Sequence, residues 1–208
     1  MTDLETELMA SIPEQPLPDV AGRAARDGLL DVAYTTEDTP LGRLLLAATP
    51  RGLVRVAYLD DDGADARRLD GDADQVLAAL AQRISPRILE APERLDGVRR
   101  ELDEFFAGSR RAFDAPLDWR LTGAGFARRV LHATARIPFG SVCSYKQIAA
   151  AAGSPRASRA AGNALGSNPM PIVVPCHRIL HSDGGLGGYT GGLDRKRALL
   201  SIEGAFEP

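Results

Sequence analysis

The chain of 208 residues has few cysteines and no long apolar run. Its two cysteines could form one disulfide at most, which excludes a small fold held together by several disulfides. No stretch approaches the ~18 uninterrupted apolar residues of a membrane helix, and the acidic residues 1–5 lack the basic and apolar regions of a signal peptide. We therefore expect a cytoplasmic protein with free thiols and no membrane partner.

Residues 1–120 contain neither cysteine nor histidine, because Cys143, Cys176 and all three histidines follow residue 130. The usual ligands of a zinc site are therefore missing from this part of the chain. The glycines between residues 184 and 192 do not fit the dinucleotide-binding pattern G-x-G-x-x-G. We expect no metal and no cofactor.

Acidic residues are absent from residues 121–182, which carry seven lysines and arginines. Residues 121–208 have ten basic and four acidic residues, a net charge of +6, whereas residues 1–120 have 15 basic and 24 acidic residues, a net charge of −9. A long basic segment suits a polyanionic partner such as DNA. A basic face that is merely solvated would have the same composition.

The pattern of turn residues and apolar spacing divides the chain into three parts. Residues 1–30 combine prolines with acids and predict a mobile arm or a loosely packed lead-in. Residues 31–118 predict an α/β domain. Strand-like segments at residues 31–36, 43–48 and 53–58 are separated by turn signals at residues 39–42 and 50–52, which indicates an antiparallel meander. Helical spacing indicates helices at 74–84 and 95–106, with a short strand near 87–89 between them.

Residues 119–208 predict short, alanine-rich helices. An apolar stripe from Phe126 to Ile137 indicates one helix. Ser144 and Gln147 fit a capping box that begins a second helix, which ends at Gly153. Ser154 is then placed to cap a third helix. Two helices joined by so tight a turn make a helix-turn-helix.

The third of these helices has two different faces. Ala161, Ala164 and Leu165 fall on one face, whereas Arg156, Arg159 and Asn163 fall on another. Small residues also make the helix slim enough to press its backbone against a groove. An alanine-rich core helix with solvated arginines would show the same pattern.

Cys176 stands at the end of an apolar, strand-like run, between Pro175 and His177. A cysteine attacks as its thiolate, and nearby imidazole or cationic groups lower its pKa from ~8.5. His177 and Arg178 are therefore candidate activators of this thiol. A Cys-His pair by itself is equally compatible with a buried cysteine that acts as a small hydrophobe.

The string Pro175-Cys176-His177-Arg178 belongs to a longer pattern, with Asn168-Pro169 before it and glycine-rich residues 187–192 and residues 199–204 after it. This pattern resembles the methylated-DNA–protein-cysteine methyltransferases, or O6-alkylguanine-DNA alkyltransferases, over roughly residues 120–204. The resemblance implies a ribonuclease-H-like α/β domain with antiparallel strands plus helices at residues 31–118. It implies a mainly α-helical, winged helix-turn-helix-like domain at 119–208, which binds DNA and accepts the alkyl group.

The resemblance also implies roles for single residues. Cys176 takes the alkyl group of O6-alkylguanine, once per molecule and irreversibly. His177 takes the thiol proton through a water, Glu203 orients His177, and Tyr145 donates to the leaving base. Arg159 enters the base stack in place of the flipped nucleotide, because a buried thiol cannot reach O6 inside a duplex. Glu203 lies near the end of a predicted helix, where the dipole disfavours an anion, so we expect a compensating partner.

The remaining implied residues form two groups. Asn168 is the hinge between the helix-turn-helix and the active-site strand, and the base pocket is lined by Tyr189, Thr190, Val174 and Ile179. The DNA-binding helix contributes Arg156, Ala157, Arg159, Ala160 and Asn163. The implied partner is double-stranded DNA containing O6-alkylguanine, bound through its minor groove. We expect a monomer, with cooperative assembly on DNA left open.

Three other functions fit parts of the same sequence. A damage-binding module that does not repair DNA is disfavoured by Cys176, which the non-enzymatic relatives lack. A helix-turn-helix regulator would read sequence with Arg156 and Arg159, but would leave the Cys-His segment without a purpose. A Cys-His hydrolase would give many products per molecule, whereas an alkyltransferase gives at most one. Cys143 has no assigned role, and we expect it to be buried.

Overall fold

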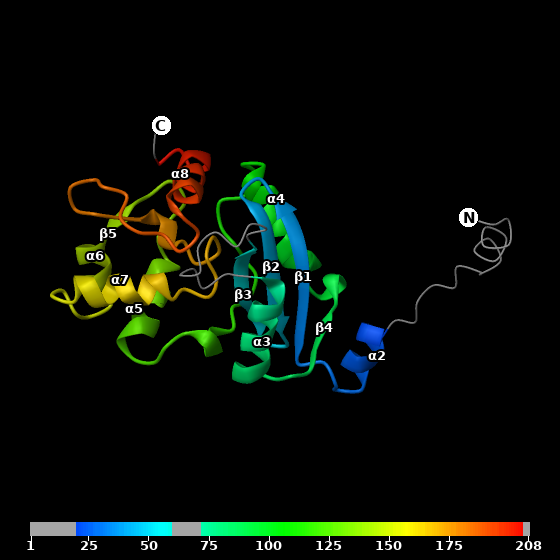
Figure 1. Cartoon of the computed structure of the whole chain (residues 1–208). Coiled ribbons are helices and arrows are strands. Elements are labelled where there is room, and N and C mark those ends of the chain that lie inside the picture. The colour runs from blue at the N-terminus through cyan, green and yellow to red at the C-terminus, as the bar shows by residue number, and fades with distance from the viewer. Residues whose placement is uncertain (1–19, 60–71, 206–208) are drawn as a thin grey trace, which may run out of the picture.

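The computed structural model describes residues 20–59 and 72–205, which form a sheet domain followed by a helical domain (Figure 1). The predicted arm lies outside the described residues as far as residue 19. Residues 20–30 contain a short helix, α2 (Val20–Arg26), which the sequence did not predict. Ala21 and Leu30 pack against the main core. Within the described residues, no helix is long and apolar enough to cross a membrane.

The sheet domain confirms the predicted meander. Its strands are β1 (Val32–Thr39), β2 (Gly42–Thr49), β3 (Gly52–Leu59) and β4 (Ile88–Glu90), in the spatial order β3-β2-β1-β4. β1, β2 and β3 pair antiparallel, while the short β4 pairs parallel with β1. The run Leu44–Ala47 is apolar throughout because β2 is central and is buried on both faces.

One helix covers each face of this sheet, as the alternation of side chains along the strands requires. Leu45 and Ala47 of β2 point to the face that packs on α3 (Ala73–Arg83). Leu44 and Leu46 point to the opposite face, which packs on α4 (Asp96–Phe106). Both helices begin within two residues of their predicted starts.

The second domain consists of short helices packed on one another (Figure 1). They are α5 (Phe126–Thr134), α6 (Tyr145–Ala151), α7 (Ser158–Gly166) and α8 (Leu193–Ile202). A parallel pair of two-residue strands, β5 (Cys143–Ser144) and β6 (Ile179–Leu180), joins the start of α6 to the segment after Cys176. Three 3-10 turns complete the fold: η1 (Pro92–Arg94), η2 (Trp119–Leu121) and η3 (Cys176–Arg178).

One predicted cap is confirmed and the next is wrong. At the start of α6, Ser144 Oγ accepts the Gln147 amide at 3.2 Å, and Gln147 Oε1 accepts the Ser144 amide at 2.8 Å. Ser154 does not cap α7. Its amide donates to Ala149 O at 2.9 Å and closes the end of α6, and its carbonyl accepts the Ala157 amide at 2.9 Å. Residues 154–157 then form a turn, and α7 begins at Ser158.

The edge of the sheet is covered by the second domain and by the segment that leads to it. On β3, the Val56 amide donates to Pro169 O at 2.9 Å and the Leu53 amide donates to Pro116 O at 2.8 Å. A Cβ atom on Gly52 would lie 2.1 Å from Pro116 O, so glycine is required for this close approach. These bonds satisfy an otherwise free edge, and one continuous hydrophobic core spans both domains.

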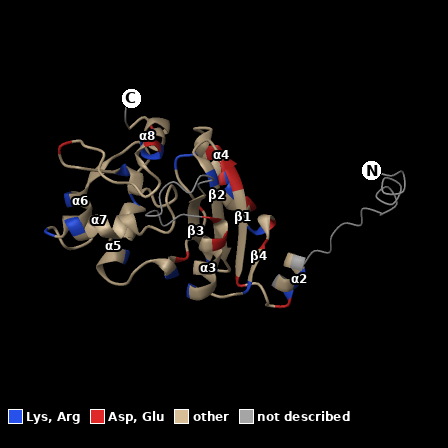
Figure 2. Cartoon of the chain, in the orientation of Figure 1, with Lys and Arg blue, Asp and Glu red and all other residues tan. Residues whose placement is uncertain are grey.

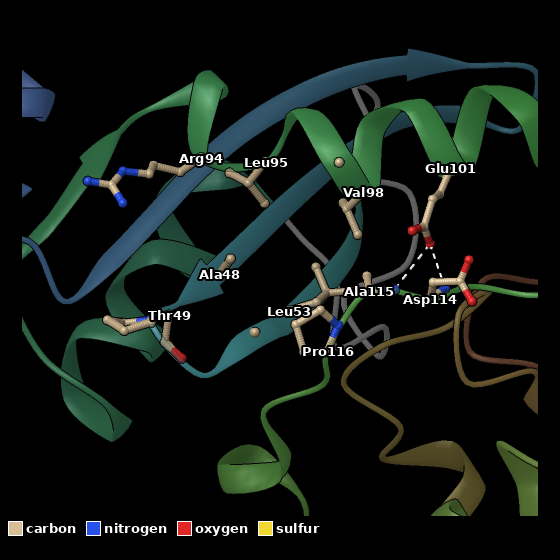
Figure 3. Close-up of a pocket in the computed structure, with 13 residues that line it drawn as sticks. Ala48, Thr49, Leu53, Arg94, Leu95, Val98, Glu101, Asp114, Ala115 and Pro116 are labelled. Carbon is tan, nitrogen blue, oxygen red and sulfur yellow. Dashed lines mark hydrogen bonds between the residues drawn. The ribbon is translucent and has the colours of Figure 1, made fainter.

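The segment before the second domain is also tied to α4 (Figure 3). The nearly buried Glu101 accepts the amides of Asp114 at 2.9 Å and Ala115 at 3.3 Å. Beside these bonds lies a pocket of about 360 Å³, lined by residues of β2, β3, α4 and the linking segment. The pocket contains none of the predicted site residues, so the candidate site lies elsewhere.

Candidate active site

The backbone that presents Cys176 is a series of turns, so the expected strand before it is wrong. Val174 donates to Met170 O at 2.8 Å, and Cys176 is the first residue of η3. Prolines at positions 169, 171 and 175 lack the amide that a sheet ladder needs. Ile172 has a φ of 72°, which is unusual for a β-branched residue. The thiol is therefore held by a stiff, strained loop.

Asn168 joins this loop to the end of α7, as expected of a hinge. Its Nδ2 donates to Val174 O at 2.8 Å, and its Oδ1 accepts the Met170 amide at 3.1 Å. Nδ2 also lies 3.2 Å from Cys176 Sγ. A donor at this distance favours the charged thiolate over the thiol. Asn168 thus contacts the sulfur itself in addition to shaping the loop.

His177, Glu203 and Arg178 form a buried chain of polar groups behind the cysteine. His177 Nε2 lies 2.9 Å from Glu203 Oε1. The guanidinium of Arg178 donates to both carboxylate oxygens, with three contacts between 2.8 and 3.1 Å, and also to Ile137 O. Glu203 is the residue that ends α8, where the helix dipole disfavours an anion. Arg178 is therefore the compensating partner expected for Glu203.

Burial and these contacts set the charges of the chain. Burial lowers the pKa of His177, although the hydrogen bond to Glu203 opposes this shift. Burial alone would raise the pKa of Glu203, but the hydrogen bonds from His177 and Arg178 together lower it. The result is a neutral imidazole that donates from Nε2 to a carboxylate. Its buried Nδ1 then carries a free lone pair and has no partner within the described residues.

Lys196 is a fully buried cation that the sequence did not single out. Its Nζ donates to Ile179 O at 2.5 Å, to Gly188 O at 3.5 Å and to Leu186 O. Burial lowers its pKa to about 8, while the charge of Cys176 opposes the shift. Lys196 therefore fastens the glycine-rich loop to β6 and places a positive charge near the thiol. The sequence offers one signal of this burial: Lys196 lies three and four residues before the buried Leu199 and Leu200, which places it on the same face of α8.

Tyr145 begins α6 and faces the same glycine-rich loop. A Cβ atom on Gly187, whose φ is +66°, would lie 2.8 Å from the Tyr145 hydroxyl. On the other side, a Cβ atom on Gly162 of α7 would lie 3.6 Å from the Tyr145 ring. Burial raises the pKa of Tyr145, so its hydroxyl keeps its proton at neutral pH. The protonated Tyr145 hydroxyl lies beside glycines that leave open space, so it is placed to donate a hydrogen bond to a flat ligand.

The other predicted pocket residues lie around Cys176 and His177. Val174 and Ile179 are fully buried, and Ile179 pairs with Cys143 across β5 and β6. The Tyr189 ring stands edge-on to His177, with centroids 6.4 Å apart. Thr190 Oγ1 donates to Gly166 O at 3.1 Å, which links the loop to the end of α7. Cys143 is half-buried, and burial raises the pKa of its thiol.

The helix α7 presents the expected basic face to solvent (Figure 2). Ala161, Ala164 and Leu165 are buried, and Ala157 is half-buried. Of the predicted residues, Arg159, Ala160 and Asn163 are exposed on α7. Arg156 is also exposed, but it and Ala157 lie in the turn before α7, so their expected place on the helix is wrong. Within the described part of the chain, neither arginine forms a hydrogen bond or an ion pair. This face can accept a polyanion without breaking an internal contact.

No cluster of three or more potential metal ligands occurs among residues 20–59 and 72–205. The residues at the candidate site supply one thiol, one neutral imidazole, one paired carboxylate and one phenol. Together they can activate a sulfur nucleophile and protonate a leaving group.

Comparisons with known proteins cover both domains. The family model "6-O-methylguanine DNA methyltransferase, ribonuclease-like domain" matches residues 32–119, and "6-O-methylguanine DNA methyltransferase, DNA binding domain" matches residues 125–205. The chain is 38% identical to the methylated-DNA–protein-cysteine methyltransferase of Mycolicibacterium paratuberculosis, over 85% of this chain and 95% of the relative. It is 37% identical to the constitutive enzyme of that name from Bacillus subtilis, over 82% and 94%.

A solved structure shows the same architecture. The structure of Mycobacterium tuberculosis OGT in complex with DNA is 37% identical in sequence and superposes with a TM-score of 0.66, over 82% of this chain and 92% of that one.

Proposed function

We propose, since the chain belongs to the methylated-DNA–protein-cysteine methyltransferase family, that it repairs DNA by moving the alkyl group of O6-alkylguanine onto Cys176. The observation that carries this assignment is the buried chain behind the thiol. His177 has a free Nδ1 lone pair and its Nε2 is held by Glu203, which Arg178 neutralises. This is the arrangement of a nucleophile, a base and an orienting carboxylate.

The reaction is an in-line displacement at the alkyl carbon. The thiol proton passes to His177 Nδ1 through a water, and the thiolate attacks the alkyl carbon. A carbon–sulfur bond forms while the carbon–O6 bond breaks, and the electron pair of that bond stays on the guanine. Tyr145, which keeps its proton because burial raises its pKa, donates to this developing anion. Lys196 and Asn168 favour the thiolate before the attack.

The product explains why each molecule reacts once. A thioether carbon–sulfur bond is not hydrolysed by water, so Cys176 is not regenerated. A Cys-His hydrolase would instead release its acyl group and turn over. The number of products per protein molecule therefore separates these two functions.

The exposed face of α7 and the turn just before it together form the proposed DNA-binding surface. Its small residues Ala157 and Ala160 allow the backbone to approach the minor groove, and Arg156 is free to bind phosphate. Because Cys176 is buried, the damaged base has to leave the duplex to react, at a cost of a few kcal/mol. Arg159 is exposed on the same face and fills the space that the flipped nucleotide leaves.

One experiment tests this function directly. The protein is mixed with a duplex that contains a single O6-methylguanine, and peptide mass spectrometry locates the methyl group. We expect at most one methyl per protein molecule, on Cys176. Cys176→Ser should abolish transfer but keep DNA binding, because a hydroxyl is far harder to ionise than a thiol. Cys143→Ser is the matched control and should react normally. Product in excess of protein, or methyl on Cys143, would contradict the proposal.

A further inference from the structure

A tyrosine of the sheet domain reaches the glycine-rich loop of the helical domain. Tyr58, on β3, is almost fully buried. Its hydroxyl lies 2.9 Å from the hydroxyl of Tyr189, within hydrogen-bond distance, and the two rings meet edge to face at 6.3 Å. These residues are 131 positions apart in the sequence. The contact therefore belongs to the interface between the domains.

The position of the Tyr58 ring is fixed from two further directions. A Cβ atom on Gly191 would lie 2.5 Å from the Tyr58 ring and 2.8 Å from the Tyr189 ring, so only glycine allows both rings to dock here. The guanidinium of Arg195 lies 4.4 Å from the centroid of the Tyr58 ring. Arg195 also donates to Leu41 O at 2.7 Å and to Gly191 O at 3.3 Å. Arg195 thus serves the interface between the domains.

Tyr189 links the fixed Tyr58 ring to the reacting groups, because it contacts both Tyr58 and His177. Its ring stands perpendicular to that of His177, with an interplanar angle of 90°. The next residue, Thr190, bonds to the last residue of α7. If the Tyr189 hydroxyl loses its bond to Tyr58, the Tyr189 ring is held less firmly in its place beside His177. An error of about 1 Å in such a position can lower a rate severely.

We infer that Tyr58 is a positioning residue for alkyl transfer: through its hydrogen bond to Tyr189, the sheet domain holds one wall of the alkyl-acceptor pocket in its reactive place. This inference rests on the proposed function. Tyr58 acts on the reaction through Tyr189, whose ring stands against that of His177. The sheet domain is then part of the reaction apparatus as well as a support for the fold.

Tyr58→Phe is the direct test, because it keeps the ring and its contacts and removes only the hydroxyl. The single-turnover rate at saturating O6-methylguanine duplex should fall by about 3- to 10-fold, the loss expected for one buried hydrogen bond. The affinity for the same duplex, measured in a Cys176→Ser background, should not change. Tyr34→Phe on β1 removes a hydroxyl from the same domain away from the site, and should leave both quantities unchanged.

A double-mutant cycle separates positioning from general stability. Tyr189→Phe breaks the same bond from the other domain, so it should slow transfer by a similar factor, and Tyr58→Phe with Tyr189→Phe should be no slower than either alone. Additive losses, or a Tyr58→Phe rate equal to that of Tyr34→Phe, would overturn the inference. Absence of transfer by the unaltered protein would instead refute the proposed function. If Tyr58→Phe fails to fold, Tyr189→Phe alone decides: an unchanged rate would overturn the inference.

Discussion

The contact between Arg178 and Glu203 makes a quantitative prediction about stability. Glu203 is buried, and its carboxylate is neutralised mainly by the Arg178 guanidinium. Replacing Arg178 by Met keeps a long apolar stem of similar shape but leaves the carboxylate, among the residues that the structure describes, with His177 and the more distant Gly140 amide, at 3.4 Å. Ile137 O loses its donor as well. Removing one partner of a buried ion pair costs about 3–5 kcal/mol of the free energy of unfolding.

This loss is large enough to measure by two methods. In a protein of this size, 1 kcal/mol corresponds to about 2–4 °C, so the melting temperature of Arg178→Met should fall by about 6–20 °C. Urea unfolding can be followed by the fluorescence of Trp119, the single tryptophan. Arg197→Met is the control, because Arg197 pairs with the fully exposed Asp194, so its loss should leave the melting temperature almost unchanged.

The loss of stability caused by Arg178→Met should also depend on pH. In the unaltered protein the pKa of Glu203 is lower in the folded than in the unfolded state. The stability it contributes is therefore present above the unfolded pKa of ~4.3 and is lost as the pH falls through the folded pKa. Without Arg178, burial should raise the folded pKa, so acid should relieve the defect. The loss caused by Arg178→Met should be smaller at pH 5 than at pH 7. A loss no larger than that of Arg197→Met, or one equal at both pH values, would refute this reasoning.

Four further predictions concern DNA and the reaction. Arg159→Ala should slow repair of a duplex strongly but leave the reaction with free O6-alkylguanine base nearly unchanged; equal slowing of both would contradict a role in flipping. Tyr145→Phe should slow both reactions by a comparable factor, measured in the same assay. Arg156→Ala should reduce the slope of log affinity against log salt by ~0.9, and an unchanged slope would mean that the side chain is merely solvated. The transfer rate should fall as the pH rises through about 8, where Lys196 loses its charge near Cys176, and Lys196→Met should lack this step.

Much of the fold follows from local patterns that the sequence displays. The turns that join β1, β2 and β3 carry proline and glycine, and the capping box at Ser144 involves residues only three apart. The exposed face of α7 is likewise a matter of helical spacing. Such features depend on neighbours in the chain, so they can be predicted without knowing the tertiary structure.

The predictions that were wrong, and the features that the sequence did not reveal, also have physical causes. Residues 172–174 are apolar and β-branched, yet the surrounding prolines remove the amides that a strand would need. Ser154 has the chemistry of an N-cap, but residues 154–157 form a turn and the helix begins only at Ser158, with Ala157 at its N-cap position. Lys196 stands in a run of four charged residues, and its burial depends on carbonyl groups that a loop brings from elsewhere. The Tyr58–Tyr189 contact has no local signal because it joins two domains.

The distribution of charge determines how such a protein approaches DNA. The net charge of −3 would disfavour any contact with a polyanion if it were spread evenly. Instead the acids of the sheet domain gather on β1 and α4, while α7, which carries Arg159, lies at the other end of the molecule (Figure 2). The continuous core between the domains keeps these two ends apart. If α7 is the DNA-binding face, as proposed, the DNA field should turn it toward the duplex, and raised salt should weaken this steering together with the phosphate contacts.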